Sequence, residues 1–427
     1  KYCTSPFIND FNMARDLLMG ASMGTFNPPD GSSTEVIDGP GVHIEADARS
    51  QLQRVAGLPD CVRTIGMPDL HPGPGLPIGM ATASRATVYP TLVGSDAGCG
   101  VTAAIARRVM APGKLLRRID EATTSDRFEV DPLRALEAVW RDGPRGLAGL
   151  PDVPEDFAAW VSAVPWTLAH GPSGPLPDAL RETRYAEALG TVGGGNHFVE
   201  LARVERVVEA NAFPGLARGA FVVLAHSGSR GLGRALIERW HQHPLREPEA
   251  VERYLGELAG CCRFAQANRA ILVWRLLRAV GSGRVDRIPA TLDLVHNDVT
   301  RDEGAWVHRK GAAPAHAGQL TITLGSRGTA SWILRGRGDR ARLCSVAHGA
   351  GRKIPRAEAK ARLAHRYRRT ELRRTAGGGE VLCDRTELLW EEHPDVYKPI
   401  EPVVAALERA GIATRVASMV PLVTVKR

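Results

Sequence analysis

Side chains able to bind a metal ion occur in short glycine-rich or polar turns that lie far apart in the chain. They are Asp96 and Cys99 in GSDAGCG, His197 in GGGNHFVE, His226 in LAHSGSRG and His296 in VHND. Enough nitrogen, sulfur and carboxylate donors for more than one divalent ion would converge if these turns meet. Candidate site residues are scattered from 69 to 426, so one intertwined domain is expected rather than separable modules.

Apolar residues at helical spacing predict helices in two parts of the chain. In residues 42–60, VHIEADARSQLQRVAGLPD, four apolar residues fall on one face (Ala48, Leu52, Val55 and Ala56). Residues 235–280 form a long, polar segment that is poor in glycine. This segment predicts two helices broken near Pro244, because proline cannot continue a helix.

Strand-like segments separate these helices. Between Ile65 and Ala106, short apolar runs alternate with glycine and proline, which is typical of strands joined by tight turns. The C-terminal VPLVTVK also predicts a strand. Residues 1–40 end in the turn-rich NPPDGSSTEVIDGP and are expected to be an N-terminal extension or loop, followed by a main domain over 41–427. The patterns predict an α+β (mixed α/β) domain, with mixed sheets and peripheral helices around a central metal cleft.

Composition narrows the class of protein. The chain has 427 residues, of which 44% are hydrophobic and 24% charged, values ordinary for a soluble globular protein. No run of eighteen apolar residues is present, and the N-terminus lacks the features of a signal peptide, so no membrane partner is expected. Seven cysteines without a CxxC pair argue against a disulfide framework and against a zinc ribbon, and they favour a reducing cytoplasm.

The formal net charge is +8, and only seven of the fifty-five basic residues are lysines. Abundant arginine can reflect a GC-rich genome, or it can indicate a partner rich in phosphate, which guanidinium binds bidentately. Residues 352–374 hold ten Arg or Lys against Glu358 and Glu371. Such a run is usually a solvated helix face, but beside a catalytic histidine it would fit a nucleic-acid backbone.

Each ligand turn has an alternative explanation when taken alone. The glycines around Asp96 and Cys99 would let both side chains face one point as a metal-bridging pair, yet many such cysteines are simply buried. In GGGNHFVE, His197 could be a ligand or a hydrogen-bonded turn residue. Asn196 and Glu200 beside it could recognise a polar group such as the edge of a base.

Two further turns follow apolar strand-like runs, where α/β proteins often present active-site groups. After His226, the exposed backbone NH groups and Arg230 would suit a phosphate, or the arginine is merely solvated. His296 and Asn297 follow LDLV in the same manner. Other polar residues are interpreted as surface or supporting groups (His308 and His316), or as part of a rigid loop that could line the site (Asp69 and His71).

The AHGAGR turn is the most suggestive of catalysis. His348 precedes a Gly-Ala-Gly sequence that removes bulk from its surroundings. A neutral imidazole is a competent nucleophile toward phosphorus and forms a reactive phosphoramidate. A nearby metal would neutralise the departing phosphate. A helix-capping turn is the alternative explanation for this motif.

Taken in order, the motifs resemble those of the RtcB family of RNA ligases. They are MPDLHPGPGLPIG, GSDAGCG, GTVGGGNHFVEL, HSGSRGLG, VHND, VHRKGAAPAHAGQ, GSRGTASWIL, HGAGR and VYKPIEPVV…VPLVTVK. The resemblance runs from about residue 43 to the C-terminus and preserves the order, spacing and glycine context of the motifs.

The resemblance implies a GTP- and Mn²⁺-dependent ligase that joins RNA with a 2′,3′-cyclic phosphate or 3′-phosphate to RNA with a 5′-hydroxyl, in RNA repair or tRNA splicing. Two Mn²⁺ ions would be held by the five ligands named first, with Cys99 bridging. His348 would be guanylated, and GMP would pass to the RNA as an RNA-ppG end. Arg230 would hold an RNA phosphate. The GMP-binding residues would be Asn196, Glu200, Asn297, Gly325, Ser326, Ser331, Gly349, Ala350, Gly351 and Lys426.

The chain also departs from the family pattern. Arg327 stands where methionine is usual, Leu324 where proline is common, and Pro74 where a lysine is frequent, while His296 lacks a preceding histidine. The motifs SDAGCG and LPDCVRTIGMPDLHPG resemble the corresponding sequences in the branch of the family that is associated with release-factor-H-like proteins. Such a protein, or an archease-like activator, is therefore a possible partner. Two alternatives remain on sequence alone: a metal-dependent phosphodiesterase that opens RNA ends without ligation, and a non-catalytic RNA-binding protein.

Overall fold

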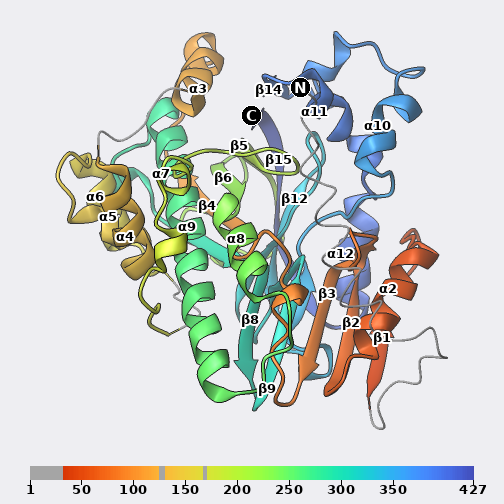
Figure 1. Ribbon diagram of the computed structural model, residues 1–427. Coiled ribbons are helices and arrows are strands. Elements are labelled where there is room, and N and C mark those ends of the chain that lie inside the picture. The colour runs from red at the N-terminus through yellow and green to blue at the C-terminus, as the bar shows by residue number, and fades with distance from the viewer. Residues whose placement is uncertain (1–31, 125–129, 167–170) are drawn as a thin grey trace, which may run out of the picture.

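The structure, a computed structural model, describes residues 32–124, 130–166 and 171–427. Within these ranges the chain forms three sheets and eleven α-helices (Figure 1). The family resemblance and the patterns of apolar residues predicted a mixed α/β fold with peripheral helices, and this prediction is confirmed. None of the described helices is both long and apolar enough to cross a bilayer.

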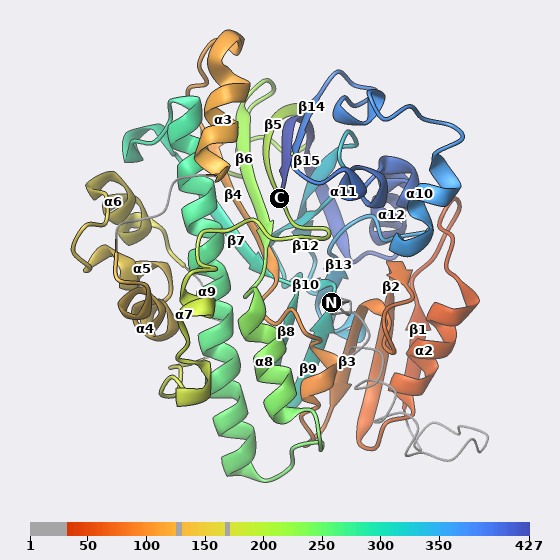
Figure 2. The ribbon, with the colours of Figure 1, turned by 45° about the horizontal axis from the view of Figure 1, so that its top comes forward.

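The largest sheet is mixed and passes through the middle of the molecule (Figure 2). Its strands run in the order β11 (Leu320–Thr323), β12 (Ser331–Gly336), β15 (Ala413–Lys426), β5 (Phe198–Val207), β6 (Phe221–Ser227), β4 (Gly100–Ala106) and β7 (Thr291–Val295). A further strand, β14 (Glu380–Cys383), pairs in parallel with β15. Several neighbours in this sheet, such as β15 and β5 or β6 and β4, are far apart in the chain, which is how distant turns can meet.

Two smaller sheets complete the framework. The five-stranded sheet has the order β1 (Ser33–Val36), β2 (Cys61–His71), β3 (Ile78–Ser84), β9 (Ala305–Lys310) and β8 (Asn297–Asp302). The two-stranded sheet pairs β10 (Ala312–Pro314) with β13 (Ser345–Ala347). One residue, His296, connects β7 of the largest sheet to β8 of the five-stranded sheet, so it lies at the junction between them.

Helices surround these sheets. They are α2 (Ala46–Ala56), α3 (Leu115–Thr124), α4 (Pro132–Asp142), α5 (Pro144–Ala148), α6 (Glu155–Ala163), α7 (Thr183–Ala186), α8 (Gly231–Trp240), α9 (Pro248–Val280), α10 (Arg356–Leu363), α11 (Thr386–Glu391) and α12 (Ile400–Arg409). The long α9 packs against β4 and β6 on one side and against α3 to α6 on the other. It is therefore buried over most of its length, although it carries several polar residues.

Most predicted elements are present. The four apolar residues predicted to share a face in 42–60 are the buried residues of α2. The predicted break near Pro244 is confirmed, since α8 ends at Trp240 and α9 begins at Pro248. The C-terminal strand is confirmed as β15. Residues 1–31 lie outside the described residues, but Ser33–Val36 of the predicted extension pairs in parallel with β2.

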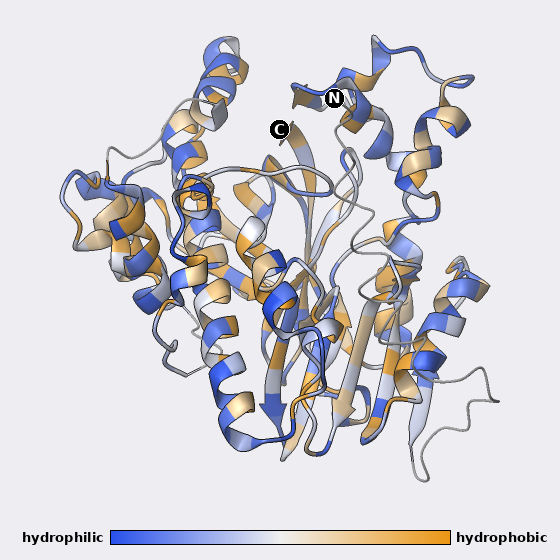
Figure 3. Cartoon of the chain, viewed as in Figure 1, coloured by the Kyte–Doolittle hydropathy of each residue, from blue (hydrophilic) through white to orange (hydrophobic). Residues whose placement is uncertain are grey.

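Two segments differ from the sequence interpretation. Met67–His71, interpreted as a rigid loop, is the end of strand β2. In the basic segment 352–374, the α-helix covers only Arg356–Leu363. Beyond it, Arg366 and Tyr367 contact Asp395 instead, and crowded like charges disfavour further helix. Figure 3 shows mostly hydrophilic residues along the segment that follows α10.

Candidate active site

Four neighbouring strands bring the five predicted metal ligands to one place. The turn with Asp96 and Cys99 leads into β4, and His197 immediately precedes β5. His226 lies in β6, opposite Phe198 of β5 and Val101 of β4. His296 follows β7, which pairs with the other side of β4. The order of the strands, rather than the order of the chain, therefore determines which turns converge.

The donor atoms of these residues lie within contact distance of one another. Cys99 Sγ is 3.5 Å from Nε2 of both His197 and His226. His197 Nε2 is 2.8 Å from Asp96 Oδ2, and His226 Nε2 is 3.4 Å from His296 Nε2. The five side chains thus form one continuous cluster of ligand atoms.

The cluster divides into two groups that share the thiol. Asp96, Cys99 and His197 form one group, and Cys99, His226 and His296 form the other, each with ligand atoms within 4.8 Å of one another. A thiolate, imidazoles and a carboxylate suit a divalent first-row metal. Two ions bridged by Cys99 therefore fit the donor set. Because a soft thiolate prefers Zn²⁺ over Mn²⁺, use of manganese would depend on its availability and on the geometry.

The electrostatics of the cluster favour a cation. Burial raises the pKa of Cys99 well above its ordinary value, and the adjacent Asp96 carboxylate raises it further. Burial alone would also raise the pKa of Asp96, but the charge and hydrogen bond of His197 lower it to about 2. An ionised carboxylate and a thiolate side by side repel each other, so the thiolate form of Cys99 requires a bound cation.

The histidines of the second group are suited to be neutral ligands. Burial lowers the pKa of both His226 and His296 well below the ordinary value, and the neighbouring histidines lower it further. His226 Nδ1 is 3.2 Å from the carbonyl oxygen of Asn196. Donation to that carbonyl places the proton on Nδ1 and leaves the Nε2 lone pair facing the cluster, as a metal ligand requires.

Two buried polar residues of α9 hold the ligand turns in position. Arg269 donates to the carbonyl oxygens of Gly98 and Ser227, at 2.9 and 3.0 Å, and forms an ion pair with Asp293. Asn268 Oδ1 accepts from the backbone NH of Gly190 and its neighbour. Arg269 therefore satisfies backbone carbonyls beside Cys99 and His226, and Asn268 fixes the turn that precedes Gly193–Gly195.

His348 lies beside the metal cluster and has a carboxylate partner. It follows β13, and its ring is 4.9 Å from that of His296, centroid to centroid. Its Nδ1 is 2.7 Å from Oδ2 of Asp69, a fully buried residue of β2. Donation from Nδ1 to this carboxylate leaves the lone pair on Nε2. The same oxygen accepts from the backbone NH of Gly349 at 3.3 Å, which fixes the turn.

The predicted nucleotide loop adjoins this turn. Leu324 donates its backbone NH to the carbonyl oxygen of His348 at 2.9 Å, so the segment beginning at Gly325 starts next to His348. The backbone NH of Gly325 donates to Ser331 Oγ at 3.0 Å, and the backbone NH of Ser326 donates to Thr329 Oγ1 at 2.8 Å. Arg327, the residue that departs from the family pattern, is buried and donates to the carbonyl of Leu389 at 2.7 Å. It therefore ties the loop to α11.

Glu200 and Lys426 occupy neighbouring strands beside the metal ligands. Glu200 accepts a hydrogen bond of 2.8 Å from Thr424. Lys426 Nζ donates to the carbonyls of Gly195 and His197 and to Glu392, at 3.1, 3.2 and 3.2 Å. The buried Glu200 and Lys426 thus place one acceptor and one donor where a base could be recognised. Asn297 instead supports the cluster by donating to the carbonyl of Asp96 and accepting from Gly311.

The three consecutive glycines at 193–195 allow three arginines to approach the backbone. A Cβ at these positions would lie 1.8 Å from Arg230, 2.7 Å from Arg385 and 2.5 Å from Arg356. Arg230 Nη1 also lies 3.3 Å from His197 Nδ1. The absence of side chains at these three positions therefore makes room for guanidinium groups. These groups place positive charge beside the ligands, where a phosphate would be attracted.

Sequence reasoning missed Glu392 and left the role of Asp69 open. Glu392 is buried and contacts Lys426, Arg352 and Tyr397. Burial alone would raise the pKa of Glu392, but the surrounding cations lower it, so it balances the charge of the basic residues. The only signal for Asp69 was its place in a Pro- and Gly-rich segment. No local signal marks Glu392, because its charged partners Arg352 and Lys426 are brought by other segments.

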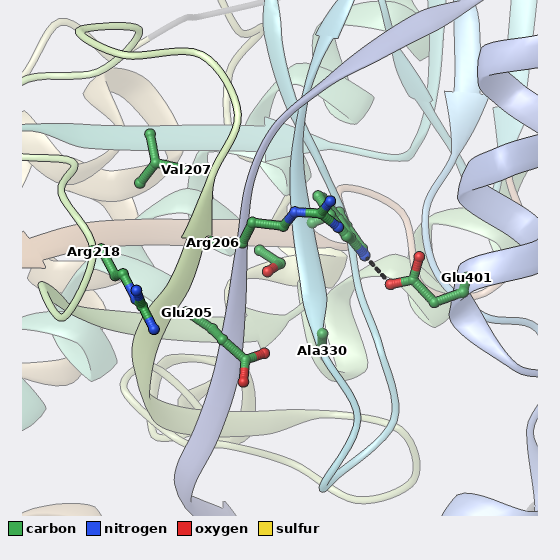
Figure 4. A pocket seen from close by; sticks show the side chains of 8 residues that line it. Glu205, Arg206, Val207, Arg218, Ala330 and Glu401 are labelled. Carbon is green, nitrogen blue, oxygen red and sulfur yellow. Dashed lines mark hydrogen bonds between the residues drawn. The ribbon is translucent and has the colours of Figure 1, made fainter.

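Two surface cavities lie away from these residues. One of about 470 Å³, shown in Figure 4, is lined by Glu205, Arg206, Val207, Arg218, Ala330, Trp332, Glu401 and Ser418. Trp332 donates to Glu401 at 2.8 Å beside it. Another of about 460 Å³ is lined by Arg239, Trp240 and Arg253. Neither is lined by a predicted metal ligand or by His348, so the chemistry is assigned from the side-chain cluster.

Comparisons with known proteins identify the family of this chain. The family model described as tRNA-splicing ligase RtcB matches residues 51–247 and 242–427. The chain is 36% identical to RNA-splicing ligase RtcB2 of Escherichia coli (strain ATCC 25922), over 95% of this chain and 98% of that protein. It is 30% identical to tRNA-splicing ligase RtcB of Pyrobaculum aerophilum, over 87% and 89% of the two chains. The chain therefore belongs to the RtcB family of RNA ligases.

Proposed function

We propose that this chain joins RNA ending in a 2′,3′-cyclic phosphate or 3′-phosphate to RNA beginning with a 5′-hydroxyl, with GTP as the energy source and His348 as the nucleophile. The observation that carries the proposal is the pairing of His348 with buried Asp69 beside two donor groups that share Cys99. A metal-dependent hydrolase needs metal ligands, but it does not need an additional histidine that is oriented by a carboxylate and binds no metal.

The first step follows from the orientation of His348. Its Nε2 lone pair attacks the α-phosphorus of GTP, a nitrogen–phosphorus bond forms, and the bond to the bridging oxygen breaks to release pyrophosphate. Asp69 keeps the proton on Nδ1 and stabilises the positive charge that develops on the ring. Two Mn²⁺ ions held by Asp96, Cys99 and the three histidines would supply charge neutralisation at the phosphate oxygens.

The remaining steps pass the guanylate to RNA. Water opens a cyclic phosphate to a 3′-phosphate, whose oxygen attacks the guanylate phosphorus. The nitrogen–phosphorus bond breaks, His348 is restored, and an RNA-ppG end forms. The 5′-hydroxyl oxygen then attacks the RNA phosphorus and loses its proton, and GMP leaves. An RNA phosphate is assigned to Arg230, and its position beside His197 supports this assignment.

Guanine recognition is assigned to Glu200, Ser331 and Lys426. Guanine presents NH donors that a carboxylate accepts and a carbonyl oxygen that an ammonium group donates to. The other nucleotide contacts are assigned to residues around the two turns, namely Asn196, Asn297, Gly325, Ser326, Gly349, Ala350 and Gly351. Their positions beside His348 and the metal ligands support this assignment.

The ligase and phosphodiesterase alternatives give different products from one labelled RNA. With a labelled strand that ends in a 2′,3′-cyclic phosphate, a 5′-hydroxyl strand, GTP and Mn²⁺, we expect a joined strand whose formation stops when GTP is omitted. The phosphodiesterase alternative predicts opened 2′,3′-cyclic ends and unjoined strands, with or without GTP. Electrophoresis of the products separates the two outcomes, and unjoined strands in the presence of GTP would refute the proposal.

The same assay should depend on pH through Glu200. Burial raises the pKa of this carboxyl to about 7, against the hydrogen bond from Thr424 and the charge of Lys426. Below that pH the carboxyl is mostly protonated and accepts guanine NH groups poorly; above it, the carboxylate accepts them. The KM for GTP is therefore expected to be about tenfold higher near pH 6 than near pH 8. Glu200→Gln should flatten this dependence, and an unchanged slope in that variant would remove Glu200 from the account.

A further inference from the structure

A third group of metal-binding side chains lies outside the active site. Asp302, His316 and Cys344 place a carboxylate oxygen, a ring nitrogen and a thiol within 4.8 Å of one another. Cys344 is buried, Asp302 is half-buried and His316 is exposed, so the group lies at the surface with its sulfur on the inner side. The active-site chemistry uses none of these residues.

Three separate segments supply this group. Asp302 ends β8, His316 follows β10, and Cys344 directly precedes β13. Because β10 and β13 are antiparallel, with Pro314 opposite Ser345 and Ala312 opposite Ala347, the group lies at one end of their sheet. His348 follows Ala347 at the other end. The group is therefore distinct from the active site, although it holds the strand that leads to the nucleophile.

The three side chains bring their ligand atoms together at one point. Among the described residues, none of the three side chains makes a side-chain hydrogen bond or an ion pair. The backbone around Cys344 is fixed, since its NH donates to Asp339 at 2.9 Å and its carbonyl accepts from Ala315 at 2.6 Å. Because Ala315 adjoins His316, these bonds hold the thiol and the imidazole on the same side.

We propose that Asp302, His316 and Cys344 bind a single Zn²⁺ ion. A thiolate, an imidazole and a carboxylate are three of the ligand types that zinc accepts, and water would complete a tetrahedral site. The ion would link the end of the five-stranded sheet to both strands of the two-stranded sheet. Binding would release the thiol proton and would stabilise the folded chain, since an unfolded chain offers no preformed site.

Co²⁺ provides a direct probe, because a thiolate bound to this ion gives a near-ultraviolet charge-transfer band. Cys99 is the thiol of both active-site groups, so the full-length Cys99→Ala variant removes their contribution. Metal-free Cys99→Ala protein titrated with Co²⁺ is expected to show a band that saturates at about one equivalent and is displaced by Zn²⁺. Absence of the band would overturn the proposal.

Second substitutions in the Cys99→Ala protein locate the ion. Cys344→Ser should abolish the band, and His316→Ala should weaken Co²⁺ binding at least about tenfold. His316 is exposed, so its substitution tests the site without disturbing the core. Cys61→Ser, which alters another buried thiol, should leave the titration unchanged. If the His316→Ala or Cys344→Ser protein still showed the band and bound Co²⁺ with unchanged affinity, the proposal would also be overturned. The readout requires neither GTP nor RNA, so it is independent of the proposed ligase mechanism.

Discussion

Replacing Asp69 with asparagine is expected to lower the rate of guanylation by about 10²- to 10⁴-fold, the range typical of a group that controls proton position at a catalytic residue. Asparagine preserves the shape of the side chain but can present an NH₂ donor to His348 Nδ1. That contact would favour the tautomer with its proton on Nε2, the nitrogen that attacks phosphorus. Single-turnover transfer of labelled GMP to the protein measures the rate.

The metal content distinguishes this effect from general damage to the site. Asp69 contacts His348 and the backbone of Gly349, whereas the metal ligands come from other strands. The Asp69→Asn protein should therefore retain both metal ions while it loses guanylation. A variant that guanylates at the wild-type rate would show that Asp69 does not orient the nucleophile.

Replacing Cys99 with alanine is expected to lower guanylation and ligation by about 10³-fold or more. Both groups of ligands share this sulfur, so its removal weakens the binding of two metal ions at once. Metal stabilisation of transition-state charge is worth several kcal/mol, and about 1.4 kcal/mol corresponds to a factor of ten. Mn²⁺ titration of the purified variant, combined with single-turnover guanylation, measures both effects.

A second buried cysteine supplies the matched control for this substitution. Cys61 lies in β2, and its thiol contacts Thr82 rather than a metal ligand. Cys61→Ala should bind two Mn²⁺ ions and guanylate like the wild type. Normal binding of two ions by the Cys99→Ala protein would disprove the bridging assignment.

Local sequence patterns predicted much of the fold. Spacing of Ala48, Leu52 and Val55 indicates the buried face of α2, and Pro244 marks the interruption between α8 and α9. Sheet order could not be predicted from these patterns, because it depends on pairings between distant strands such as β4 with β6. The helix in 352–374 is shorter than its composition indicates, since Asp395 holds Arg366 and Tyr367.

The site was predictable where glycine-rich turns mark the functional side chains. Cys99 and His296 adjoin strands, His226 lies near the end of one, and the structure brings the three together as predicted. The partner of His348 was not predictable in the same way, because Asp69 is 279 residues away in the chain. The glycines at 193–195 were recognisable as unusual, but only the fold shows that they make room for arginine side chains.

The central claim is that His348 carries the guanylate, and covalent labelling tests it most directly. Protein incubated with Mn²⁺ and GTP labelled at the α-phosphate should become labelled, and peptide mapping should place GMP on His348. The bond should be labile in mild acid, as phosphoramidates are, and His348→Ala should remain unlabelled. Equal labelling of the His348→Ala protein, or no labelling of the wild type under these conditions, would contradict the account.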